Sequence, residues 1–375
     1  MPHADTLARL LEGIDENALE SRYEDLLKVF IKLESFEKIN PGRFLVAADG
    51  TQKFSRDYCW DDHALSRNAG DPEKESYYAY MVESVLILDN GMVLPLLTET
   101  LENGENLDGN GKQDCEIKAF KRLAKRLEKL LGKGCVTIVL DGLYATGPVI
   151  SLCQNYGWEF MIALKRDSLK TVWEDFDGLR MIETENVHEA QWGERGQIYC
   201  WSNGITYIYG DNNKKLSLNL VTCAEFWHDP HPRKGKPRDY ITEYAWLSSS
   251  KVTEQNVFML CTKIARWRWR IENHFLVLKH QGYKYTHCFS YDWNAMKGFH
   301  CLAKFANFIN ALITCSNVMD NDVVAEGIKG LIKKVWQFLF LRGLPDMEDN
   351  TKLIGTAEQN KSWKIRFRKF GFRYA

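Results

Sequence analysis

Hydrophobic positions recur along this chain with two different periods, and each period predicts one kind of element. Leucine, phenylalanine and isoleucine at helical spacing predict helical structure across residues 5–37. A short apolar run at 44–48 reads as a buried strand. Residues 77–88 and 92–97 then read as two strands of a hairpin, because Asp-Asn-Gly between β-rich runs is a strong turn signal.

The helical period returns at residues 115–131, where one apolar face ends at Gly132. A second apolar run at 136–140 predicts another buried strand. A short helix beginning near Pro148 and a strand at 159–164 follow. The order strand, hairpin, helix, strand, helix, strand predicts a mixed sheet with helices packed on it.

Beyond residue 165 the pattern changes again. Residues 166–250 contain several short β-rich runs between turns, which predicts a β-rich insertion. Helical spacing resumes at 253–279, and residues 292–314 and 323–340 predict two further helices. We therefore expect five segments: 1–40, 41–165, 166–250, 251–345 and a basic aromatic tail at 346–375.

Charge divides unevenly along the chain. The formal net charge of the whole chain is −1. Residues 251–375 hold 13 Lys and 7 Arg against 5 Asp and 5 Glu, so this third carries +10 and the rest carries −11. A basic C-terminal third suits a polyanionic partner, although charge alone favours a dipolar soluble protein. Ten scattered cysteines, without a Cys-x-x-Cys pair, favour a reducing cytoplasm.

Two aspartates each follow a predicted buried strand. Asp49 comes after the run at 44–48, and Asp141 after the run at 136–140. Carboxylates at neighbouring strand ends converge in the crevice outside a sheet, and Mg²⁺ prefers oxygen ligands. Taken alone, such residues are more often turn or cap residues.

A third carboxylate is expected from the helix at 253–279. Glu272 has Arg268 four residues before it and Lys279 seven residues after it, so all three share one helical face. The same triple also suits a surface ion-pair helix. An acid for a metal beside cations for phosphate is nevertheless the combination that phosphoryl transfer requires.

In combination these residues resemble an insertion-sequence transposase of the DDE class, in the branch with a β-rich insertion between the second Asp and the Glu. The matching segments are Ala48-Asp49-Gly50-Thr51, Val139 to Ala145, and the signature Tyr-x2-Arg-x3-Glu-x6-Lys at Arg268, Glu272 and Lys279. Ala265 stands where that signature has its tyrosine. The segment Gly111 to Ala119 also resembles one that such transposases carry.

The resemblance implies an RNase H-like fold, with a mixed five-stranded sheet flanked by helices. It implies that Asp49, Asp141 and Glu272 hold two Mg²⁺ or Mn²⁺ ions for DNA cleavage and strand transfer. The implied partners are terminal inverted repeats and target DNA, bound by a homodimer in a prokaryotic, nucleoid-associated setting, with no membrane. The expected DNA-binding residues are Arg268, Lys279, Arg266, Arg270, Lys234, Lys236, Arg366 and Arg368.

Two other functions fit parts of the same pattern. Only 48 residues precede Asp49, which leaves little room for an end-recognition domain, so the chain could be a truncated or inactive relic that only binds DNA. A glycosidase also uses paired carboxylates, but the basic C-terminal third is unnecessary for that chemistry. The basic tail fits an edge strand and a DNA-backbone contact equally well.

Overall fold

The computed structural model describes residues 4–32, 42–71, 73–103, 112–230, 238–315 and residue 330. The chain forms two compact units. One consists of residues 1–37, 88–94 and 274–375, and the other of residues 38–87 and 95–273. Apart from residue 330, the predicted helix at 323–340 lies outside the described residues, as does the tail at 346–375.

The larger unit is built on a mixed sheet whose centre is β1 (Phe44–Arg56). On one side β1 pairs antiparallel with β3 (Ser76–Ile87), which also pairs with β4 (Val93–Leu101) and with the short β2 (Leu65–Arg67). On the other side β1 pairs in parallel with β5 (Val136–Leu140), and β5 pairs in parallel with β6 (Glu159–Ala163). The predicted mixed sheet is therefore present.

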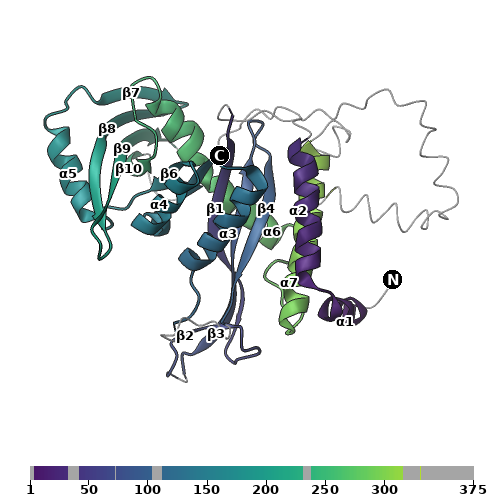
Figure 1. The fold of residues 1–375 in the computed structure, drawn as a ribbon. Helices are drawn as coiled ribbons and strands as arrows, with labels where there is room; N and C mark the ends of the chain where they lie inside the picture. The colour runs from purple at the N-terminus through teal and green to yellow at the C-terminus, as the bar shows by residue number, and fades with distance from the viewer. Residues whose placement is uncertain are drawn as a thin grey trace, which may run out of the picture. The chain divides into compact units, whose positions relative to one another are not determined.

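The β-rich insertion extends this sheet. Its strands are β7 (Val187–Trp192), β8 (Arg195–Tyr209), β9 (Lys214–Asp229) and β10 (Arg238–Ser248), and β10 pairs antiparallel with β6. The five predicted core strands thus become part of one ten-stranded sheet in the described part of the chain. Figure 1 shows α5 (Lys170–Arg180), which the hydrophobic pattern did not predict, beside the insertion strands.

Two helices flank the central strands. The amphipathic α3 (Glu116–Leu131) contacts β1 and β3 through a buried face that includes Phe120, Leu123 and Leu127. It ends at Gly132, whose φ of 95° lies in the left-handed region that glycine tolerates. The helix α4 (Gly147–Asn155) contacts β6 (Figure 1). Both helices lie where the sequence predicted them.

The predicted helix at 253–279 is not continuous. A π-helical turn, η2 (Met259–Ile264), leads into a 3₁₀ turn, η3 (Ala265–Arg268), and only then does α6 (Trp269–His280) begin. Departures from regular α-helix of this kind occur frequently at functional sites. Here they come immediately before Glu272, in the first turn of α6.

The smaller unit is helical. Its α1 (Ala4–Gly13) and α2 (Glu16–Lys32) both contact α7 (Trp293–Cys315). The Lys304 ammonium lies 2.7 Å from a carboxylate oxygen of Glu20, and the lysine side chain is 3% exposed. The predicted N-terminal helices therefore pack against the predicted helix at 292–314. No described helix is long and apolar enough to cross a membrane.

A buried ion cluster stabilises the insertion. Glu225 on β9 is fully buried, and its two carboxylate oxygens accept hydrogen bonds from Arg195, Arg266 and Gln197. The Arg266 guanidinium also lies over the rings of Trp192 and Tyr244. The cluster thus connects the insertion strands to η3, two residues before Arg268.

We predict that Glu225→Gln lowers the free energy of unfolding by about 3 kcal/mol, because it removes the buried charge that faces Arg266 and Arg195. Urea unfolding of the full chain measures the loss. Glu243→Gln, on the neighbouring strand β10 and exposed, is the matched control and should change stability by less than about 0.5 kcal/mol. Equal losses in the two variants would contradict a stabilising role for the cluster.

Candidate active site

Asp49 lies within β1 and not after its end. The strand continues to Arg56, and Asp49 is paired with Glu83 of β3. The predicted strand end at Ala48 is therefore wrong, because β3 supplies hydrogen-bond partners beyond that point. The parallel pairing with β5, however, ends at Ala47 and Val139, so Asp49 lies just beyond that parallel ladder.

Asp141 follows β5 directly, as predicted. It caps the 3₁₀ turn η1 (Gly142–Tyr144), and its Oδ1 accepts a hydrogen bond from the Leu143 backbone N–H at 2.9 Å. Because Ala47 is paired with Val139, Asp49 and Asp141 are each two residues beyond that last pair. This register places the two carboxylates at the same edge of the parallel strands.

Arg268 connects Asp49 to the third predicted acid. Its guanidinium lies 2.7 Å from Oε1 of Glu272 and 3.5 Å from Oδ2 of Asp49. The Arg268 side chain is 13% exposed, against 37% for Glu272. The structure therefore brings together residues from β1 and α6 that are more than 200 positions apart in the sequence.

Glu116, in the first turn of α3, is a further acid at this centre. Its carboxylate accepts hydrogen bonds from the hydroxyls of Tyr80, at 2.6 Å, and Tyr144, at 3.3 Å. From the sequence, Asp114 and Glu116 are candidates for a place near the site, but the favoured interpretation is that they cap and charge the first turn of their helix. Asp114 precedes the helix, accepts a hydrogen bond from the Cys115 N–H at 2.9 Å and pairs with Arg122 at 2.7 Å. Glu116 is in that first turn, but its hydrogen-bond partners are tyrosines 36 and 28 residues away.

Burial and like charges raise the pKa of Asp49 to about 7. Burial is the largest cause and the charge of Asp141 is the second. The backbone N–H of Gly50 and the Arg268 guanidinium act in the opposite direction, and Glu116 raises the pKa further. The raised pKa means that the charged form of the Asp49 carboxylate is destabilised, and a bound cation would stabilise it.

The donor set suits a hard divalent cation. Asp49 and Asp141 offer carboxylate oxygens, Asp49 is desolvated, and the charge of Asp141 disfavours the charge of Asp49, so that a cation would relieve the repulsion. Within the described residues, no three His, Cys, Asp or Glu side chains form a group that could hold one ion. Arg268 is the positive charge between Asp49 and Glu272 in this arrangement.

Comparison with known families adds a second line of observation. The family described as transposase DDE domain matches residues 110–309, which is more than half of the chain. The chain belongs to this family of DDE transposase domains. The matched segment contains Asp141, Arg268, Glu272 and Lys279, and Asp49 lies before it. No curated protein matches the chain.

Family membership implies transposase or nuclease activity, divalent metal ions as cofactors and DNA as a partner. The sequence reached the same family through its motifs, and that prediction is confirmed. The roles of individual residues in this transposase remain predictions.

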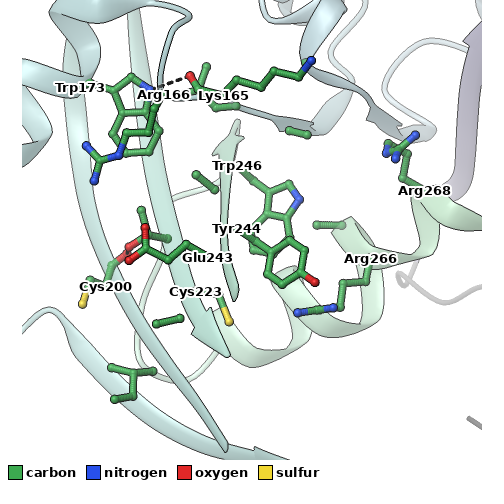
Figure 2. Close-up of a pocket in the computed structure, with 18 of the residues that line it drawn as sticks. Lys165, Arg166, Trp173, Cys200, Cys223, Glu243, Tyr244, Trp246, Arg266 and Arg268 are labelled. Carbon is green, nitrogen blue, oxygen red and sulfur yellow. Dashed lines mark hydrogen bonds between the residues drawn. The ribbon is translucent and has the colours of Figure 1, made fainter. Parts of the chain in front are cut away.

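A pocket of about 530 Å³ lies beside the acidic residues of the transposase. Gly142, which follows Asp141, and Arg268 are both among its lining residues. Figure 2 shows Tyr244, Trp246 and Arg266 on one part of the wall and Trp173 with Arg166 on another. The Arg166 guanidinium lies 3.9 Å from the Trp173 ring centroid. The wall thus combines aromatic rings with positive charge.

The predicted DNA-binding residues lie in different environments. Arg266 is 11% exposed and is held by Glu225, so its placement gives no support to a phosphate contact. Arg270 lies over the Trp267 ring, and burial lowers its pKa. The Lys279 ammonium is 5.8 Å from the Phe275 ring centroid. Lys234, Lys236, Arg366 and Arg368 lie outside the described residues.

We predict that, without metal, the transposase loses stability as the pH rises from about 4 to about 7. The folded state binds the Asp49 proton more tightly than the unfolded chain does, so raising the pH removes that proton at the expense of the folded state. Asp49→Asn should abolish this contribution. In EDTA the variant should exceed the parent by about 1–4 kcal/mol at pH 8 and match it near pH 4.

Thermal unfolding of both proteins between pH 4 and pH 8 measures the difference. Other titrating groups are common to the two proteins, so they cancel in the comparison. Parallel pH profiles would mean that the Asp49 pKa is not raised.

Proposed function

We propose that this transposase cuts and rejoins DNA at the ends of an insertion sequence, with Asp49, Asp141 and Glu272 as its metal-binding acids. The observation that carries the proposal is the bridge from Asp49 through Arg268 to Glu272, beside Asp141. These are the residues that the motif spacing selected, and they come from three separate elements.

The strand order supports an RNase H-like catalytic domain. Without β2 and the insertion, the sheet runs β4-β3-β1-β5-β6, in which β3 is antiparallel to β1 and β5 is parallel to it. Functional residues of such open sheets gather where the parallel strands end. Asp49 and Asp141 are at that place in this chain.

Two Mg²⁺ or Mn²⁺ ions, when bound, would activate a nucleophile and stabilise the leaving oxygen. Asp49 would contribute to both ions, Asp141 to one and Glu272 to the other. Arg268 would exchange its contact with these acids for a DNA phosphate, because a guanidinium binds either anion in the same bidentate way. Thus Arg268 would hold the strand beside the acids.

The two proposed reactions consume only water and DNA. In strand cleavage, a water oxygen forms a bond to phosphorus and the bond from phosphorus to the 3′ oxygen breaks, which leaves a 3′-hydroxyl and a 5′-phosphate. In strand transfer, that 3′-hydroxyl attacks a target phosphodiester, and one ester bond is exchanged for another. In each reaction the attacking water or hydroxyl loses one proton to solvent, and the leaving 3′ oxygen takes one proton up from solvent.

The pocket beside Arg268 would receive part of the DNA strand. Its cations, which include Lys165, Arg166 and Arg180, suit phosphates, and its aromatic rings suit bases. Two ends of an insertion sequence must be processed together, so we propose that a homodimer acts on terminal inverted repeats. Lys279 would supply a further phosphate contact from α6.

We predict that Asp49→Asn, Asp141→Asn and Glu272→Gln each lower Mn²⁺-dependent cleavage of inverted-repeat DNA by about a thousandfold or more, since each removes a proposed ligand. DNA binding should stay within about threefold of the parent, because phosphate contacts supply most of that affinity. A strand-cleavage assay and an electrophoretic binding assay on the same DNA measure the two quantities.

The matched control is Asp57→Asn, an exposed acid directly after β1 that should cut like the parent. Cleavage by Asp49→Asn at the parental rate would refute the assignment. DNA binding by the parent with no metal-dependent cleavage would instead identify a relic that only binds DNA.

A further inference from the structure

Two tyrosine hydroxyls fix the carboxylate of Glu116 in place. Tyr80 on β3 donates to Oε1 at 2.6 Å, and Tyr144 on η1 donates to Oε2 at 3.3 Å. Tyr144 is fully buried, and its ring lies 5.0 Å from that of Phe120 on the same helix as Glu116. Each oxygen of this acid therefore has a donor from a different element.

Gly50 provides the space for this carboxylate. A Cβ at position 50 would lie 2.5 Å from Oε2 of Glu116 and 2.6 Å from Cε1 of Tyr80. The backbone φ of Gly50 is not in the left-handed region, so the glycine is required for its volume and not for its conformation. Position 50, next to Asp49, therefore needs a glycine to leave room for the Glu116 carboxylate.

Glu116 is coupled electrostatically to Asp49 and Asp141. Burial is the main cause of its raised pKa, and the charge of Asp141 contributes in the same direction. The hydrogen bonds from Tyr80 and Tyr144 act in the opposite direction. Glu116 in turn raises the pKa of Asp49.

The alternation of β1 determines the side from which Glu116 acts. Successive residues of a strand point to opposite faces, so a carboxylate at the Gly50 position approaches the strand from the face opposite the Asp49 side chain. Both oxygens of Glu116 are also used by the tyrosines. This arrangement suits an acid that supports the centre without ligating an ion.

We propose that Glu116, clamped by Tyr80 and Tyr144, is a positioning residue that raises the affinity of the Asp49–Asp141 pair for divalent cations. It supplies a fixed negative charge behind the pair. It also holds Tyr144 at the end of the 3₁₀ turn that Asp141 caps. The inference rests on the proposed metal-binding role of Asp49 and Asp141.

The test measures Mn²⁺ binding to the full chain without DNA, and the electron paramagnetic resonance signal of the free ion monitors the binding. Glu116→Gln should weaken binding about tenfold, the lower end of the effect of removing an outer partner of metal ligands. Tyr80→Phe keeps the charge but removes one donor, so we expect a loss of roughly threefold to fivefold. If Glu116→Gln does not fold, Tyr80→Phe decides by itself.

Glu128→Gln is the matched control, since it makes the same charge change on the same helix, 12 residues away. It should bind Mn²⁺ like the parent. If Glu116→Gln and Tyr80→Phe also bind like the parent, the inference about Glu116 is wrong.

Asp49→Asn separates this failure from that of the proposed function. Loss of tight Mn²⁺ binding in Asp49→Asn, with parental binding in Glu116→Gln, would refute only the role of Glu116. Parental binding in Asp49→Asn would refute the metal centre, and with it the role of Glu116.

Discussion

The larger unit depends on the stabilisation of carboxylate charge that is buried away from water. Burial raises the pKa of Asp49 and of Glu116, and the charge of Asp141 raises both further. Fixed dipoles and the Arg268 guanidinium stabilise these charges. Backbone N–H groups serve the two aspartates, tyrosine hydroxyls serve Glu116, and Arg268 lies between Asp49 and Glu272. The fold thus maintains an anionic centre that a cation can stabilise further.

The insertion contributes to the same centre through Arg268. Arg266 is anchored to the fully buried Glu225, and Arg268 is only two residues further along η3. Because β10 pairs with β6, the strands that carry Glu225 continue the sheet that carries Asp49 and Asp141. Arg266 of the buried cluster and Arg268 of the candidate active site are therefore two residues apart on η3, and their acidic partners Glu225 and Asp49 lie on one sheet.

Hydrophobic periodicity predicted the central strands and helices because their signals are local, as with the helix that ends at Gly132. It ended β1 at Ala48, where the apolar run stops, whereas pairing with β3 extends the strand to Arg56. It favoured a role for Glu116 in the first turn of its helix, because a local pattern cannot show the hydrogen bonds from Tyr80 and Tyr144 in distant segments. The spacing of the sequence motifs selected Asp49, Asp141 and Glu272. The parallel pairing of β1 with β5 explains why the two aspartates, although distant in sequence, lie at the same edge of the sheet.

The pairing of β1 with β3 also determines which insertions and deletions the coding sequence of β1 can tolerate. From Leu45 to Gln52 the two strands are paired without interruption, and the register shifts only after Gln52. A codon lost before Asp49 would turn this carboxylate to the opposite face, because the side chains of a strand alternate. A codon gained or lost after the irregularity at Lys53 would leave Asp49 and Gly50 in place. The irregularity at Lys53 therefore separates two segments of β1. The pairing register of the first segment cannot shift by one residue, whereas the length of the second can vary.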